Sequence, residues 1–248
     1  MQRWHILIEY DGTDLVGLQA QAKGDSVQSL IETAIHAYSG ERPRLHAAGR
    51  TDAGVHALSM SAHFDLMRPA SPHEITGALN AYLRETSVVV LAANAVDEDF
   101  HARFSCMARH YEYHILNRLH PSILWKQRAW HVSKKLDISA MQQAAHLLIG
   151  QHDFSSFRAA DCQANSPIKT LDRLDIEEKG EFIYVYASAK SFLHRQVRNM
   201  VGTLVEIGKG KYPYASMADI LAGKDRKLAG TCAPAYGLYF VKADYIQS

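Results

Sequence analysis

Alternation of apolar and polar side chains predicts two half-buried strands in the first part of the chain. Within residues 3–10, Trp4, Ile6 and Ile8 occupy every second position, and the segment ends at a turn-forming Asp-Gly pair. Residues 58–64 alternate in the same way, with apolar side chains at the even-numbered positions. Since side chains of a strand point alternately to its two faces, each segment is expected to bury one face.

Two amphipathic helices and a further strand complete this first part. Apolar side chains recur at helical spacing over 27–38, with Ser26 as a natural N-cap and Gly40 just past the end. At Ser71 a capping box is combined with a proline at the first helical position, which predicts the start of the second helix. Residues 87–94 are mostly apolar and are predicted as a buried strand.

The same succession of strands and helices returns after an acidic stretch, residues 97–100, which is interpreted as a linker. The elements predicted beyond it are, in chain order, a strand over 110–117, a helix over 138–150 capped by Asp137 and ended by Gly150, two strands over 170–178 and 182–189 that turn at Lys179-Gly180, a long helix from about Phe192 to Ile207, a short helix near 216–222 and a terminal strand over 237–245. Strands separated by single helices, twice over, favour an α+β class with two halves, residues 1–100 and 101–248, on antiparallel or mixed sheets. No strand is followed by a glycine-rich loop that opens a helix, so Rossmann and P-loop folds are disfavoured.

Composition and length are those of an ordinary globular protein. The chain has 248 residues, of which 47% are hydrophobic and 21% charged, enough to bury a core without disulfides or metals. It contains no run of about 18 apolar residues, and its start lacks the zones of a signal peptide, so no membrane association and a cytoplasmic location are expected. The cysteines are odd in number and far apart, which favours reduced thiols: Cys106, Cys162 and Cys232.

Charge is distributed unevenly along the chain, although the net charge is only +1. Residues 101–135 hold seven Lys or Arg and one acid, whereas residues 161–181 hold six acids and three bases. Aromatic side chains are interleaved with the basic segment: Phe104, Tyr111, Tyr113, Trp125 and Trp130. This pattern is compatible with a surface that follows a phosphate backbone and stacks bases, and also with a solvated basic face.

One stretch, AAGRTDAGVHA over residues 47–57, combines glycines with an acid and a base. As a phosphate loop it lacks the lysine and the hydroxyl residue on which that mechanism depends. The nearby side chains that could bind a metal lack the spacing of a helical metal motif: His46, Asp52, His56 and His63. A structural turn would need only the glycines and a surface ion pair.

The remaining interpretation of this stretch is a catalytic carboxylate. An aspartate such as Asp52 is ionised at neutral pH and needs no base to act as a nucleophile, and Arg50 would keep it ionised in a closed site. A lone carboxylate suits chemistry at an electrophilic sugar carbon. Ordinary glycosidases use two carboxylates, and no second one stands in a comparably marked loop. From the residues alone, the structural turn and the catalytic carboxylate both remain open.

The segment GRTDAGVHA, residues 49–57, resembles the signature of the tRNA pseudouridine synthase A family. Other segments resemble this family in the same order along nearly the whole chain: YDG (10–12), SVQ (26–28), DFHARFS (99–105), ARHYEY (108–113), DFSSFRA (153–159), FLHRQVRNMVG (192–202) and GLYFV (237–241). The resemblance implies an enzyme that isomerises uridine to pseudouridine at positions 38 to 40 of the tRNA anticodon stem-loop, with no metal or other cofactor. It also implies two ferredoxin-like halves joined through a central antiparallel sheet, an active-site cleft between them, and a homodimer that shares each tRNA.

The resemblance also assigns roles to single residues. Asp52 is expected to be the catalytic nucleophile, and Arg50 to contact phosphate or help extrude the target nucleotide. Tyr111 is expected to pack on the target base, where stacking offsets much of the cost of flipping. Arg198, a charged residue in an otherwise apolar helix, is expected to pair with the catalytic aspartate, and Leu238 to line the base pocket. The first half thus carries the catalytic loop, and the second half the basic RNA-facing segment and the dimer contacts.

The segment 15–21 departs from the family pattern. The family usually has an aromatic residue and a Gly-Trp-Gln-Arg-Gln stretch here, whereas this chain reads LVGLQAQ. Because this loop is expected to touch RNA, a non-catalytic RNA-binding protein or tRNA chaperone on the same fold is the alternative function. A nucleoside or sugar hydrolase is a third hypothesis, and the absent second acid counts against it.

Overall fold

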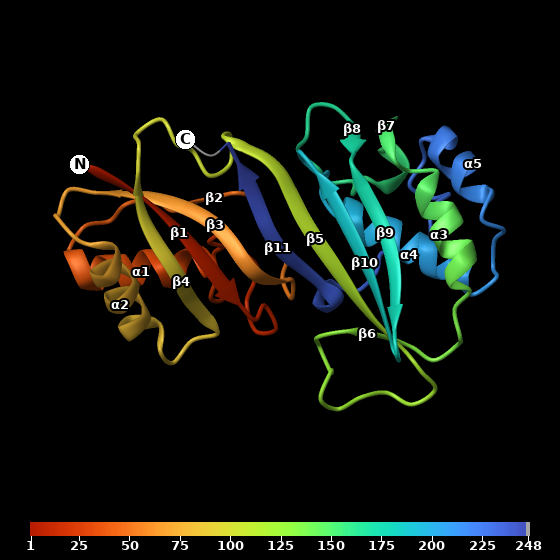
Figure 1. Cartoon of the computed structure of the whole chain (residues 1–248), viewed down its shortest axis with the longest axis horizontal. Helices are drawn as coiled ribbons and strands as arrows, with labels where there is room; N and C mark the ends of the chain where they lie inside the picture. The colour runs from red at the N-terminus through yellow and green to blue at the C-terminus, as the bar shows by residue number, and fades with distance from the viewer. Residues whose placement is uncertain (247–248) are drawn as a thin grey trace. The chain divides into compact units, whose positions relative to one another are not determined.

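Two compact units make up the part of the chain that the structure, a computed structural model, describes, namely residues 1–246 (Figure 1). The first unit comprises Met1–Arg109 and the chain from Tyr239 onward, and the second comprises His110–Leu238. These bounds differ from the division after residue 100 that the sequence suggests, because residues 101–109 and the last strand of the chain are grouped with the first unit.

Strands and helices alternate in the first unit. Its elements are β1 (Gln2–Tyr10), α1 (Val27–Ser39), β2 (His46–Ala47), β3 (His56–Leu66), α2 (Pro72–Leu83), β4 (Val88–Val96) and β11 (Leu238–Tyr245). The strand order is β4-β1-β3-β11, in which β1 runs antiparallel to both neighbours and β11 runs parallel to β3. Helix α1 packs against α2, and α2 packs on β4 (Figure 1). The mixed, mostly antiparallel architecture confirms the predicted α+β class.

Capping residues set the helix ends of this unit where the sequence predicts them. The Ser26 hydroxyl accepts from the Ser29 N–H at 3.0 Å, and Gly40 ends α1 with a φ of 77°. Ser71 and Glu74 cap each other at the start of α2. The core between these helices and the sheet consists of fully buried side chains: Trp4, Ile6, Ile8, Ile31, Ile35, Met60 and Phe64.

Burial of two strands in this unit differs from the prediction. Strand β3 is buried on both faces from Met60 to Phe64, because residues 100–104 and Tyr245 cover the face that was expected to be solvated. Leu58, which was expected on the apolar face, is 39% exposed. Strand β4, predicted as buried, has several exposed side chains because it ends the strand order of this unit.

The second unit combines a sheet with three helices. Its elements are β5 (Cys106–Asn117, which begins in the first unit), β6 (Trp130–Val132), α3 (Ile138–His146), β7 (Gly150–Asp153), the short helix η1 (Ser155–Phe157), β8 (Ile168–Leu171), β9 (Arg173–Lys179), β10 (Phe182–Ala189), α4 (Gln196–Gly208), α5 (Ser216–Gly223) and the short helix η2 (Ala235–Gly237). The strand order is β5-β10-β9, with β6 parallel to β5 and a separate antiparallel pair formed by β7 and β8. Helix α3 packs on β9 and α4.

Two helices of this unit are shorter than predicted. Helix α3 begins after Asp137 as expected but ends at His146, and Gly150, with a φ of 105°, starts β7 instead of ending the helix. Helix α4 begins only at Gln196, because Arg195 has a φ of 60° and cannot continue a helix. The apolar pattern before Arg195 therefore reflects buried loop residues, of which Leu193 is 3% exposed.

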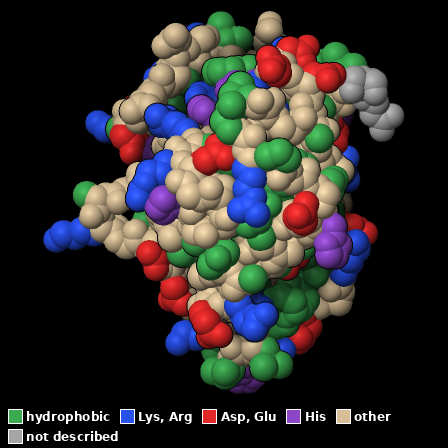
Figure 2. Space-filling view, turned by 90° about the vertical axis from the view of Figure 1, so that its left-hand side faces the viewer, with side chains coloured by type: hydrophobic (Ala, Val, Ile, Leu, Met, Phe, Trp, Pro, Cys, Tyr) green, Lys and Arg blue, Asp and Glu red, His purple; other side chains and the backbone are tan. Residues whose placement is uncertain are grey.

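The described surface has mixed charge in the view of Figure 2. Lys, Arg, Asp and Glu side chains are interspersed with apolar ones over the end of the first unit that lies at the left of Figure 1, which is typical of a solvated surface. None of the helices within residues 1–246 has the length and apolar character that a membrane span requires.

Candidate active site

Asp52 lies in the loop between β2 and β3, which we call the Asp52 loop (residues 48–55). Its side chain is half-buried, whereas Arg50 is exposed. The Val55 N–H donates to the Asp52 carbonyl at 3.2 Å, and Gly54 has a φ of 80°, a combination that closes a tight turn directly after the carboxylate. The glycine is needed for this positive φ, and the turn fixes the backbone from which the Asp52 side chain projects.

Residues 10–18 brace the Asp52 loop through backbone contact. The Tyr10 hydroxyl lies 2.8 Å from Thr51 Oγ1, and the Leu18 N–H donates to the Thr51 carbonyl at 3.2 Å. A Cβ added at Gly12 would lie 2.1 Å from the Val55 carbonyl oxygen, and one at Gly17 would lie 2.7 Å from that of Thr51. Only glycine permits this close approach, so the backbone of the segment packs directly on the backbone of the loop.

His56, at the start of β3, is buried and completes this brace. The Gly12 N–H donates to His56 Nδ1 at 3.1 Å, and the Asp11 carboxylate lies 3.1 Å from the same nitrogen. The ring stacks on Tyr239 of β11 with 4.7 Å between centroids, and these two residues are partners in the parallel ladder. Within residues 1–246, no three His, Cys, Asp or Glu side chains are placed to hold a metal ion together.

Arg109 holds the beginning of the Asp52 loop, a role that the sequence reasoning missed. Its side chain is 8% exposed, and Nε and Nη2 donate to the Ala48 carbonyl at 2.8 and 2.7 Å. Nη2 also donates to the Arg103 carbonyl at 2.8 Å. A buried arginine is costly unless its donors are satisfied, so these bonds fix the two backbone segments against each other. A signal was present, because Arg109 shares its strand face with the buried Tyr111 and Tyr113.

In the second unit, Tyr111 lies on β5 and is 9% exposed. Its ring packs edge-on against Phe192, with 5.3 Å between centroids and an angle of 90° between planes. Edge-to-face contact holds the ring in one orientation. Tyr111 alternates with Tyr113 and Ile115 on the buried face of the strand.

Arg198 and Tyr113 together hold the segment 233–237 that leads to Leu238. Arg198, on α4, donates from Nε to the Ala233 carbonyl at 2.8 Å, and the Ala233 N–H donates back to the Arg198 carbonyl at 3.1 Å. The Tyr113 hydroxyl donates to the Pro234 carbonyl at 2.8 Å. Leu238, 7% exposed, follows this segment directly and begins β11.

The structure thus places the predicted site residues in two groups, each described within its own unit. Arg50 and Asp52 share one braced loop in the first unit. Tyr111, Arg198 and Leu238 belong to the second unit, where Arg198 is tied to the segment that precedes Leu238. The first group can present a carboxylate and a guanidinium to a ligand, and the second an aromatic ring and an apolar side chain.

Comparison with known proteins gives consistent matches along the chain. The sequence model of a family described as tRNA pseudouridine synthase matches residues 6–105 and 144–246. A protein named tRNA pseudouridine synthase A from Rhizorhabdus wittichii is 51% identical over 245 residues, which cover 99% of this chain and 96% of that protein. Proteins of the same name from Rhodospirillum centenum and Methylocella silvestris are 51% and 49% identical over 245 residues, covering 99% of this chain and 100% and 99% of their own lengths.

Proposed function

The chain belongs to the tRNA pseudouridine synthase family, and we propose that it converts uridine to pseudouridine at positions 38 to 40 of the anticodon stem-loop, with Asp52 as the nucleophile. Membership makes the protein an isomerase that acts on tRNA. The observation that carries the finer proposal is the Asp52 loop, whose GRTDAGVHA sequence is held by backbone contacts on one side and by Arg109 on the other.

The proposed reaction exchanges one glycosidic bond for another. The bond between the ribose C1′ and uracil N1 breaks, the base rotates, and a bond forms between C1′ and C5. The C5 proton leaves and N1 gains a proton, so the product is an isomer of the substrate and no co-reactant is consumed. A carboxylate suits this chemistry because positive character develops at the sugar carbon when the base departs.

The proposed reaction requires that the first unit hold the Asp52 loop in a fixed position. A misplacement of about 1 Å can cost on the order of 100-fold in rate, so a nucleophile benefits from a backbone that cannot shift. Close approach of Gly12 and Gly17 to the loop provides this constraint. Arg50, exposed two residues before Asp52, is proposed to contact an RNA phosphate or to help extrude the target nucleotide.

The second group of residues is proposed to bind the flipped base. Extruding a nucleotide costs a few kcal/mol, and stacking on one aromatic ring returns roughly 1–3 kcal/mol, so the fixed ring of Tyr111 would offset much of this cost. Leu238 is proposed to line the base pocket, and Arg198 to pair with the catalytic carboxylate. We further propose that the enzyme is a homodimer that works without a cofactor, as the family resemblance implies, and that it works in the cytoplasm, as expected from its sequence.

Release of tritium from tRNA labelled at uridine C5 tests this proposal, because the C5 proton must leave. The wild-type protein is expected to release tritium, and Asp52→Asn, which keeps the size of the side chain, is expected to release none while still binding the tRNA. Asp14→Asn is the matched control, since Asp14 is an exposed aspartate in the bracing segment. Equal release by Asp52→Asn would overturn the nucleophile assignment, and tRNA binding without any release by the wild type would favour the RNA-chaperone function.

A further inference from the structure

A tight turn at residues 101–105, which we call the 101–105 turn, is fixed on the covered face of β3. The Ala102 N–H donates to Nδ1 of the buried His63 at 3.1 Å, and the Tyr245 hydroxyl donates to the Ala102 carbonyl at 2.7 Å. Within the turn, the His101 N–H donates to the Ser105 hydroxyl at 2.9 Å. These bonds leave the turn little freedom to move.

This rigid turn holds the Phe104 ring in solvent. The Phe104 side chain is 75% exposed, and its ring lies 4.4 Å from that of His101 and 5.5 Å from the Arg103 guanidinium carbon. A single exposed apolar side chain needs no explanation by itself. Here, however, the ring projects from a hydrogen-bonded turn, is flanked by a second ring and is accompanied by a cation, which are the components of a stacking platform for nucleic-acid bases.

The histidine rings behind Phe104 lie in contact with one another. His101 lies 4.6 Å from His63, which stacks on His46 at 5.0 Å. Burial and the neighbouring His101 lower the pKa of His63 to about 4, and burial also lowers the pKa of His101. Phe104 is therefore backed by His101 and His63 as neutral rings at neutral pH, and the cation beside it is Arg103.

The 101–105 turn is attached to the Asp52 loop. Arg109 Nη2 donates both to the Arg103 carbonyl and to the Ala48 carbonyl, so one nitrogen joins the turn to the start of the loop. Both segments belong to the first unit. The turn that carries Phe104 and the loop that carries Asp52 are therefore joined through a single side chain of the first unit.

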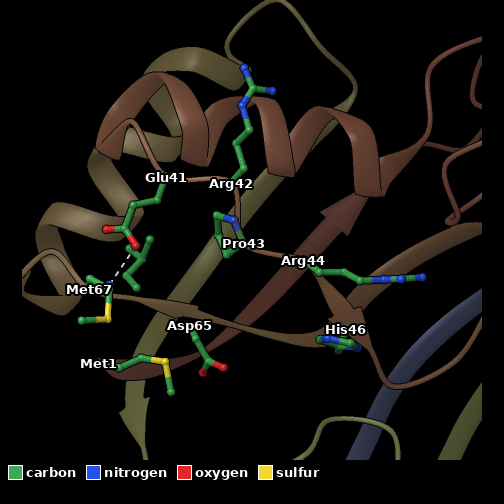
Figure 3. A pocket seen from close by; sticks show the side chains of 9 residues that line it. Met1, Glu41, Arg42, Pro43, Arg44, His46, Asp65 and Met67 are labelled. Carbon is green, nitrogen blue, oxygen red and sulfur yellow. Dashed lines mark hydrogen bonds between the residues drawn. The ribbon is translucent and has the colours of Figure 1, made fainter.

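Charged side chains of both signs lie on the side of β2. A cavity of about 410 Å³ there is lined by residues that include Glu41, Arg44, His46 and Asp65 (Figure 3). Its acids are already engaged, because Arg3 binds the Asp65 carboxylate at 2.8 Å and holds its pKa below the usual range. Glu41 accepts from two backbone N–H groups, and the Arg44 side chain points away from it, on the side of His46 (Figure 3).

We propose that Phe104 and His101 form a stacking platform for a single-stranded nucleotide of the tRNA next to the target uridine, with Arg103 and Arg44 on the flanking phosphates. The inference rests on the proposed function. The acidic residues 97–99, which precede the turn, would repel the backbone on their own side and so direct the strand toward β2. The platform would contribute to substrate affinity and leave the chemical step to Asp52.

Steady-state kinetics of tritium release from full-length tRNA tests the platform. Phe104→Ala is expected to raise KM about 5- to 150-fold with kcat nearly unchanged, because stacking on one ring contributes equally before and in the transition state. Phe104→Tyr should restore the wild-type KM, whereas Phe104→Leu, which keeps apolar bulk without an aromatic face, should not. Tyr82→Ala removes an aromatic side chain that is 55% exposed on α2 and serves as the matched control.

A direct readout uses an anticodon stem-loop with 2-aminopurine in place of a loop base. Stacking on the platform is expected to change the 2-aminopurine fluorescence when the Asp52→Asn variant binds the stem-loop. This change should be lost in the Asp52→Asn, Phe104→Ala double variant.

Arg103→Ala is expected to lower the slope of log affinity against log salt by about 1. If the wild type releases tritium and Phe104→Ala keeps its KM, the platform is disproved while the proposed function stands; absence of release by the wild type would disprove the function itself. A Phe104→Leu variant with wild-type KM would also disprove stacking, because apolar bulk without an aromatic face would then suffice.

Discussion

The Asp52 loop and the segment 233–237 are held by different kinds of contact. In the first, the backbone of residues 10–18 approaches so closely that a Cβ at Gly12 would meet the Val55 carbonyl oxygen at 2.1 Å. In the second, Arg198 and Tyr113 each bind one carbonyl through a side chain, beside one backbone bond from the Ala233 N–H to the Arg198 carbonyl. Close backbone approach at the glycines is particular to the first region, although Arg109 also binds the start of that loop through its side chain. The side-chain hydrogen bonds can be removed one at a time, whereas the close backbone approach can be disturbed only at the glycines.

The largest effect is expected from Gly12→Ala. The added methyl group would push the Asp52 loop away from its position, and tritium release is expected to fall at least about 100-fold because the carboxylate is displaced. Gly77→Ala is the matched control: this glycine lies in α2 with open space around it, so alanine should stabilise the protein by roughly 0.5–1 kcal/mol. Retained activity in Gly12→Ala would show that close backbone approach does not position the loop.

The second largest effect is expected from acid, which should lower the free energy of unfolding of the first unit. His63 accepts from the Ala102 N–H as a neutral ring, and its pKa is lowered from about 6.5 to about 4. Between these values the unfolded chain binds the proton more readily, so the free energy of unfolding should fall as pH drops from 6.5 to 4, by at most roughly 3 kcal/mol, and should be insensitive to this group above pH 6.5.

Denaturant titrations at several pH values measure this dependence. His63→Phe should flatten it over the same range, while His120→Phe, which replaces an exposed histidine in the second unit, should not. An unchanged slope in His63→Phe would rule out His63 as its source.

Side-chain support of the segment 233–237 should yield intermediate effects. Tyr113→Phe leaves the Pro234 carbonyl without its donor and is expected to cost about 1–2 kcal/mol of stability, with a smaller loss of activity. Arg198→Met, which keeps the length of the side chain, should cost a similar amount and reduce kcat more strongly, because Arg198 is also proposed to pair with Asp52. Equal kcat in the two variants would leave Arg198 with a purely structural role.

The smallest effect is expected from Tyr10→Phe. This change removes the hydroxyl that lies 2.8 Å from Thr51 Oγ1 but keeps the backbone contacts of the Asp52 loop. The loss should be about 1 kcal/mol or less in unfolding free energy and less than about 5-fold in tritium release. A loss comparable to that of Gly12→Ala would mean that this hydroxyl, rather than the backbone, holds the loop.

Local signals in the sequence predict the elements well because caps and periodicity are local. Ser26, Ser71 and Asp137 begin helices where expected, and the alternation in residues 3–10 is that of β1. Arg195 shows the limit, since its left-handed backbone starts α4 later than the apolar pattern suggests. Apolar periodicity indicates which residues are buried, and the residues of a buried loop can follow the same pattern as those of a helix.

Long-range pairing is what the sequence does not reveal. The parallel ladder that joins Tyr239 to His56 and the bond from Arg109 to Ala48 connect segments that no local pattern relates. The position of Asp52 in a loop could be predicted because its motif is contiguous. The contacts that hold this loop could not be predicted, although the turn-forming Asp-Gly pair already indicated that Gly12 lies at a turn.

We infer that the carboxylate of Asp52 performs the isomerisation in the anticodon stem-loop. This inference is tested by incubating one unmodified tRNA with equal amounts of wild-type protein and Asp52→Asn, and measuring by nucleoside chromatography the pseudouridine formed in the excised stem-loop. We expect pseudouridine at positions 38 to 40 with the wild type and none with Asp52→Asn, although both bind the tRNA. Pseudouridine formation by Asp52→Asn at the wild-type rate, or formation only outside these positions, would contradict the role proposed for Asp52.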